Sequence, residues 1–229
     1  MPTPSRFPNG IGTRKAPDPL YMYGHPDRTD YHTFFDDFDT YTSGQWTATV
    51  TGTGTTALTA GDGGLLASAT SGASSDANYL QKATEGFSFE TGKPAWFKTR
   101  FKVSALTTVV AIGLQVTDTT PEDVTDGIYF LSTVTTGAVT CYCRKNATTG
   151  STSGSAGTLV ADTFTELAWY WDGKDSVEVF QDGVKVSTIT GASAYIPDTT
   201  TTVSFGIRTT SAAIKTLTLD YLFASKSRR

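Results

Sequence analysis

The chain has 229 residues and a formal net charge of -4, and 17% of its residues are charged, against about 25% in an average soluble domain. This acidic balance argues against a nucleic-acid-binding surface that covers the whole domain. No apolar run reaches the roughly 18 residues that a membrane-spanning helix needs, and no positively charged start leads into an apolar stretch as in a secretory signal. We therefore expect partners that are neither nucleic acid nor membrane.

Threonine takes the place of the missing charged residues. Together with valine and the aromatic residues it favours strands, because branched and aromatic side chains pack well on a pleated surface. We find no stretch of about ten or more residues with apolar positions at helical spacing. The length allows a sizeable core. The sequence therefore predicts an all-β fold.

Residues 1–33 differ from the rest of the chain, since they hold six of the nine prolines. Proline removes a backbone donor and restricts the residue before it, so this segment is not a central strand. Aromatic side chains are interleaved here with arginine and lysine, whereas disordered tails are usually poor in aromatics. We expect an extended N-terminal arm that docks on a partner or a neighbouring subunit, with a loosely ordered leader as the alternative.

From residue 34 the pattern changes to short segments separated by turn residues, which is typical of a sandwich or barrel. In residues 96–103 a mostly charged set of side chains alternates with a mostly apolar set, so one face meets a core and the other meets solvent. The predicted strands cover residues 34–38, 46–50, 65–69, 79–82, 87–89, 95–103, 109–116, 128–134, 139–144, 166–171, 176–181, 184–188, 202–208 and 216–224.

Turn signals separate these strands. Asp172-Gly173 and Asp182-Gly183 predict tight turns, because glycine accepts the positive φ that such turns need. The serine-, threonine- and glycine-rich residues 147–157 predict a long surface loop, and residues 51–56 a shorter one. We expect one antiparallel two-sheet sandwich over residues 34–225, followed by a basic tail at 226–229.

Few residues of this domain suggest chemistry. Cys141 and Cys143 share one face of a strand, and their spacing matches neither a redox nor a zinc motif, so we expect free thiols in a reducing cytoplasm. Both histidines, His25 and His32, fall in the arm, which leaves a nucleophile in the domain without a histidine base. They also lack a third nearby metal ligand.

Carboxylate pairs are relevant because many β-sandwiches are glycosidases, which need two acids on either side of the scissile bond. The acidic run at Asp36, Asp37 and Asp39 starts a strand, where carboxylates usually cap turns. Residues 118–127 could hold calcium, but their spacing departs from a calcium loop and favours a solvated acidic turn. We therefore expect no enzyme, no cofactor and no metal.

The order of several short motifs resembles a family of tailed-bacteriophage structural proteins, beginning with Arg6, Phe7, Asn9 and Gly10. The motifs that carry the resemblance cover nearly the full chain and lie at residues 5–11, 31–41, 61–66, 95–98, 112–115, 118–121, 126–130, 182–186, 204–207 and 220–224. The resemblance implies a head decoration (cement) protein with a concanavalin A/laminin G-like jelly-roll sandwich. It also implies a place on the outer capsid surface of the virion, after synthesis in the host bacterial cytoplasm.

Such a protein would clamp neighbouring capsomers without catalysis, with the major capsid protein as its partner and a homo-oligomer, preferably a trimer, as its form. An arm adds contact area across a joint without a large globular interface. The candidate capsid contacts are the basic, aromatic and amide side chains Arg6, Phe7, Asn9, Arg14, Lys15, Tyr21, Tyr23 and Arg28.

The alternative function is a carbohydrate-binding (lectin-like) module on the phage head or a fibre. It would need exposed aromatic side chains beside a groove, and the four tryptophans are the candidates: Trp46, Trp96, Trp169 and Trp171. In strands of this period most tryptophans enter the core, and Trp169 and Trp171 share a face as a core row would.

Overall fold

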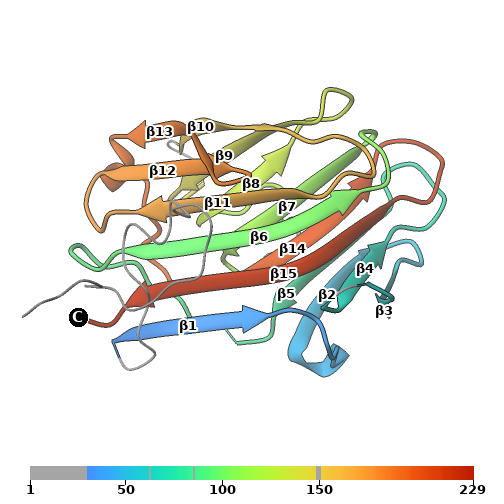
Figure 1. Ribbon diagram of the computed structural model, residues 1–229, viewed down its shortest axis with the longest axis horizontal. Coiled ribbons are helices and arrows are strands. Elements are labelled where there is room, and N and C mark those ends of the chain that lie inside the picture. Colours follow the sequence, from blue (N-terminus) through green and yellow to red (C-terminus); the bar gives the residue numbers. More distant parts are fainter. Residues whose placement is uncertain (1–29, 62, 85, 148–150) are drawn as a thin grey trace, which may run out of the picture.

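Two antiparallel sheets pack face to face in a computed structural model that describes residues 30–229 except 62, 85 and 148–150 (Figure 1). Sheet A follows the order β13 (Val184–Thr190), β12 (Ser176–Gln181), β11 (Thr165–Trp171), β6 (Ala95–Val103), β15 (Thr216–Ser227), β4 (Leu65–Ala69) and β3 (Thr55–Thr59), with β1 (Tyr31–Asp36) also on β15. Sheet B follows the order β10 (Ser151–Thr158), β9 (Ala138–Arg144), β8 (Gly127–Ser132), β7 (Thr108–Gln115), β14 (Thr202–Thr209), β5 (Ala77–Lys82) and β2 (Trp46–Thr51).

The protein is an all-β jelly-roll sandwich, as the sequence predicts. Its other regular elements in the described residues are two short 3-10 turns, Ser43–Gln45 and Ala192–Ala194. No described helix is long and apolar enough to span a membrane.

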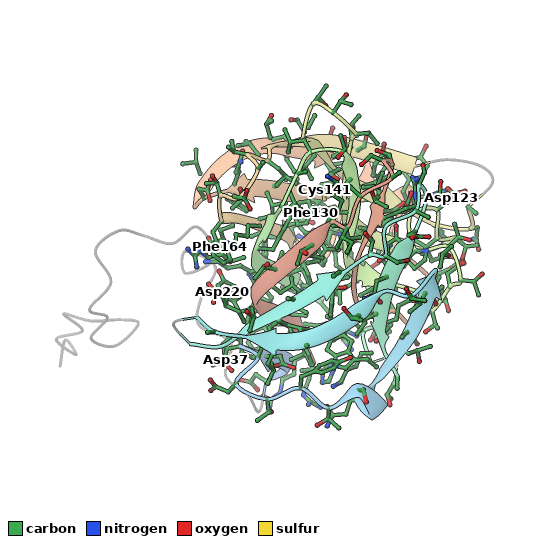
Figure 2. All side chains as sticks on the ribbon, turned by 90° about the vertical axis from the view of Figure 1, so that its right-hand side faces the viewer. Asp37, Asp123, Phe130, Cys141, Phe164 and Asp220 are labelled. Atoms are coloured by element: carbon green, nitrogen blue, oxygen red, sulfur yellow. The ribbon has the colours of Figure 1, made fainter. Side chains whose placement is uncertain are left out.

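The core lies between the sheets because each strand alternates its side chains across the pleat. On β6, Phe97 and Phe101 point inward and are fully buried, and Phe97 stacks on Trp169 of β11 at a ring-centroid distance of 6.0 Å. Sheet B contributes Ile112, Phe130 and Cys141 to the same cluster. Figure 2 shows Phe130 and Cys141 between the layers, with Asp220 and Phe164 on one outer side and Asp123 on the other.

The first and last described strands, β1 and β15, pair with each other, and β1 lies at an edge of sheet A. Tyr31 lies opposite Ser227 and Asp36 opposite Leu222, so β1 runs antiparallel to the end of β15. Strand β1 therefore starts three residues before the predicted domain boundary. The predicted basic tail also shortens, since β15 includes Lys226 and Ser227, and Lys226 is buried with its Nζ 2.7 Å from Glu90.

Three segments differ from their predicted structure. Residues 151–158 form strand β10 instead of a surface loop, because their backbone pairs with β9 even though serine and glycine are weak strand formers. Residues 55–59 form strand β3 for the same reason, through pairing with β4. The predicted strand at 87–89 reduces to one bridge between Phe87 and Thr201.

Candidate functional site

The eight residues predicted to contact a capsid lie outside the described residues, as does His25: Arg6, Phe7, Asn9, Arg14, Lys15, Tyr21, Tyr23 and Arg28.

A pocket of about 250 Å³ opens at the end of the sandwich where β9 and β11 finish. This is the left-hand end in Figure 1, where the C-terminus and the start of β1 also lie. Its lining divides into an apolar part and a polar part. The apolar part consists of Phe89, Trp171, Ile196 and Pro197, and the polar part of Thr91, Lys145, Lys174, Ser193 and Asp198.

The apolar wall is aromatic because β11 ends on an inward-facing tryptophan. Trp171 is buried, and the ring of Phe89 meets it edge-on at a centroid distance of 5.5 Å. The indole Nε1 of Trp171 has no hydrogen-bond partner among the described residues. Leaving a buried donor unpaired costs about 1–3 kcal/mol.

The turn after Trp171 places Lys174 at the pocket. The Asp172 carboxylate accepts hydrogen bonds from the backbone N–H groups of Lys174 and Ser176, at 2.8 and 3.1 Å. Gly173 has a φ of 77°, and its carbonyl oxygen accepts a 2.6 Å hydrogen bond from the N–H of Gly92. A Cβ on Gly173 would meet the backbone of the 92–94 segment at about 3 Å, so the close approach of these two loops requires glycine here.

Two carboxylates, Asp175 and Asp198, hold residues on the polar side of the pocket in place. Asp175 accepts bonds from the N–H and the hydroxyl of Ser193, and these bonds lower the pKa of Asp175. Asp198 forms a 3.0 Å ion pair with Lys145, whose hydrogen bond lowers the pKa of Asp198. Among the described residues that line the pocket, Asp198 is the single carboxylate, and Lys174 forms no ion pair with any described residue.

The acidic loop of residues 116–126 is not a solvated turn, because it packs over the outer face of sheet B. Glu122 accepts two bonds from Arg208, at 2.6 and 2.7 Å, and one from the Tyr79 hydroxyl. Burial and the Glu122 charge raise the pKa of Tyr79. Asp126 accepts the N–H of Asn146, and Asp123 pairs with Arg144. No group of three or more potential metal ligands occurs in the described parts of the chain.

The remaining candidates lie in structural positions. Cys141 and Cys143 are free thiols facing the core, and burial raises the pKa of Cys143 to about 12. His32 on β1 packs on Phe87, and burial lowers its pKa. Asp36 caps a turn by accepting the N–H of Phe38. All four tryptophans are buried, so none offers an exposed platform.

Solved structures share this fold at low identity. A protein of unknown function from Shewanella oneidensis is 12% identical, with a TM-score of 0.62 over 95% of this chain and 97% of that one. An endo-1,3-β-glucanase from Streptomyces sioyaensis is 12% identical, with a TM-score of 0.63 over 90% and 99%. The carbohydrate recognition domain of Emp47p is 10% identical, with a TM-score of 0.59 over 87% and 98%.

These likenesses place the chain in the class of concanavalin A-like jelly-roll sandwiches, the fold of glucanases and lectin domains, and at such identities they show the fold alone. No protein-family model matches the sequence, and no curated protein matches it. Nothing in these likenesses supports the resemblance to phage decoration proteins.

Proposed function

We propose that this protein is a carbohydrate-binding module and that the pocket at the end of the sandwich holds the sugar. The observation that carries the proposal is the pairing of an aromatic wall, Phe89 and Trp171, with polar side chains on the opposite side of the pocket. Binding sites for small molecules are mostly apolar with a few polar groups that fix orientation. A sugar ring matches this arrangement, since it has apolar C–H faces and a periphery of hydroxyl groups.

The pocket supports binding rather than hydrolysis. Glycoside hydrolysis generally uses two carboxyl groups, one of which must be held protonated as the acid. Asp198 has no second carboxylate beside it in the described lining, and its pairing with Lys145 favours the ionised form. The likeness to carbohydrate recognition domains agrees with this choice, although the fold is shared with glucanases.

The test is a glycan array followed by calorimetry with Trp171→Phe. This variant keeps an aromatic ring but removes the indole N–H and part of the wall, so affinity should fall about tenfold or more. Trp169→Phe is the matched control, because Trp169 faces the core on the same strand, also has an unpartnered Nε1, and does not line the pocket. Absence of binding to every glycan, or an equal loss in both variants, would overturn the proposal.

A variant at the exposed side of the pocket avoids the risk of misfolding. Lys174→Gln should weaken glycan binding several-fold while leaving the thermal midpoint unchanged, because the side chain is exposed and has no ion-pair partner among the described residues. Lys185→Gln on β13 is the control, since Lys185 is also exposed and lies outside the pocket. Equal affinities for the wild type and both variants would remove Lys174 from the site.

Capsid decoration remains a second candidate, supported by the way the domain holds the segment after the arm. Six residues of β1 pair with the last part of β15. If residues 1–29 were bound to a capsid, a pulling force on them would therefore pass directly to sheet A. In this proposal the arm binds the major capsid protein on the outer surface of the virion, and trimers remain the favoured form.

Its test is a deletion of residues 1–29, which leaves β1 intact, whereas a deletion of 1–33 would remove half of that strand. The truncated protein should show a wild-type β-sheet circular dichroism spectrum and fail to bind purified heads from which decoration protein has been removed. Wild-type occupancy by the truncated protein would exclude the arm as the attachment.

A further inference from the structure

The size and borders of the pocket restrict what it can hold. Its volume of about 250 Å³ lies below the range of about 300–1,000 Å³ typical of sites that enclose drug-sized ligands. On one side the backbone bond between Gly92 and Gly173 joins the two loops that carry Thr91 and Lys174. Elsewhere the Lys145–Asp198 ion pair links two of the lining side chains to each other. The pocket thus has room for about one sugar ring and offers no continuous groove along these borders.

The outer face of sheet B is the broad surface on which a longer chain could otherwise lie, and the loop of residues 116–126 occupies it. Three strands hold the loop through side chains. Gln81 of β5 accepts the N–H of Asp118 at 2.8 Å, Gln115 of β7 donates to the carbonyl of Pro121 at 2.6 Å, and Arg208 of β14 binds Glu122.

The loop fits closely because the face beneath it is flattened by glycine. Gly113 lies opposite Tyr129, and Gly206 lies opposite Tyr79, so each tyrosine ring can lie across a strand without a Cβ in its way. Val124 of the loop is fully buried, and Tyr79 packs with Ala111 in a small apolar cluster on this face. The central part of the face is therefore filled by the protein's own loop.

From the small pocket and the covered face we infer that the protein recognises one terminal sugar ring of a glycan and not an internal stretch of polysaccharide. This inference rests on the proposed function, because it concerns the ligand of the same pocket. The aromatic wall would take the apolar face of the ring, and the exposed side chains of Lys174 and Ser193 would bind its hydroxyl or carboxylate oxygens. The next ring of the glycan would project into solvent.

The test compares affinity with chain length. Methyl glycosides of glucose, galactose, mannose and glucuronic acid are titrated by calorimetry, each beside its linear oligosaccharides of two to six rings. For the sugar that binds, the dissociation constant should stay within about threefold from one ring to six, because only one ring makes contacts. The Trp171→Phe variant should weaken every member of the series by the same factor.

Two other outcomes have different meanings. If affinity rises tenfold or more with length, an extended site exists, and terminal recognition is wrong while carbohydrate binding stands. If no member of any series binds and the glycan array is also empty, the proposed function itself fails. Trp169→Phe serves again as the control for stability, since a loss of affinity in both tryptophan variants would reflect a disturbed core.

Discussion

The outer face of sheet B and the pocket at the end of the sandwich contain the same kinds of side chain, aromatic rings beside paired charges, but one is filled and the other is hollow. On sheet B the charges belong to different layers: Glu122 of the loop reaches Arg208 and Tyr79 of the sheet. The ion pair therefore draws the loop onto the face. At the pocket the polar groups bond to each other around a space, as Lys145 does with Asp198.

The two regions also differ in what their glycines allow. Gly113 and Gly206 let the neighbouring strands and their tyrosines Tyr129 and Tyr79 pack closely on sheet B, since a Cβ at either glycine would clash with them. Gly173 instead lets two loops meet beside the pocket, and the large side chains Phe89 and Trp171 remain as its wall. A region with aromatic and charged residues offers a binding site only where the contacts among those residues leave a space, as they do around the Lys145–Asp198 pair.

The largest loss of stability is expected when a side chain is added at Gly113 on sheet B. In Gly113→Ala the new Cβ would lie about 2.5 Å from the Cα of Tyr129 and 2.6 Å from the carbonyl oxygen of Ile128. These are backbone atoms of a paired strand, which cannot rotate away, so we expect the free energy of unfolding to fall by about 3 kcal/mol. Urea denaturation measures the change.

Gly72→Ala is the control for this substitution, because a Cβ at Gly72 meets no atom within 4 Å. Its stability should stay close to that of the wild type. A Gly113→Ala protein as stable as the Gly72→Ala protein would show that the face has room, and the contrast between a filled face and a hollow pocket would be lost.

The sequence predicts the strands well where charged and apolar side chains alternate. It predicts them poorly where only backbone pairing with a neighbouring strand makes a segment a strand. β6 and β12 have the predicted bounds because their charged and apolar residues alternate cleanly. The sequence does not predict β10, since its serine and glycine residues carry no pattern and only the pairing with β9 makes them a strand. The register also carries β1 into residues assigned to the arm.

The pocket was not predicted because its residues come from separate segments, each ordinary when taken alone. Trp171 and the Asp172-Gly173 turn were noted, but nothing in the sequence places Phe89, Lys145 or Asp198 beside them. The β7–β8 loop illustrates the same limit. Its carboxylates suggest a solvated turn, and only the fold brings Arg208 to Glu122.

A smaller loss of stability is expected when the loop of residues 116–126 loses its ion pair with sheet B. Glu122→Ala leaves the Arg208 guanidinium without its carboxylate and Tyr79 without its acceptor, in a site where both charged side chains are mostly covered. The free energy of unfolding should fall by about 2 kcal/mol, below the value for a fully buried pair because solvent still reaches Arg208. Thermal unfolding and amide hydrogen exchange of residues 116–126 measure the change.

Arg229→Ala is the comparison for this pair. Arg229 forms its ion pair with Asp30 in an exposed position, where such pairs contribute little. If Glu122→Ala has no more effect than Arg229→Ala, the ion pair does not hold the loop on sheet B.

The smallest effect is expected from Glu90, whose contribution to the stability of the folded protein depends on pH. Glu90 follows Phe89 of the pocket wall and accepts bonds from Lys226 and Lys93, both at 2.7 Å, which lower its pKa to about 2. Because the pKa in the folded state lies below the unfolded value of about 4.3, the folded protein binds fewer protons here. The contribution of Glu90 is therefore complete above that unfolded value and is lost as the pH falls towards 2.

Glu90→Gln removes this contribution at every pH. The melting temperature of the wild type should exceed that of the variant slightly near neutral pH, because exposed ion pairs stabilise weakly, and the two should converge as the pH approaches 2. Circular dichroism melts between pH 2 and 7 measure the difference, and other acids cancel because both proteins share them. A difference that stays constant with pH would mean that Glu90 acts through packing beside the pocket, whereas convergence would show that the loop carrying Phe89 is held to β15 by charge.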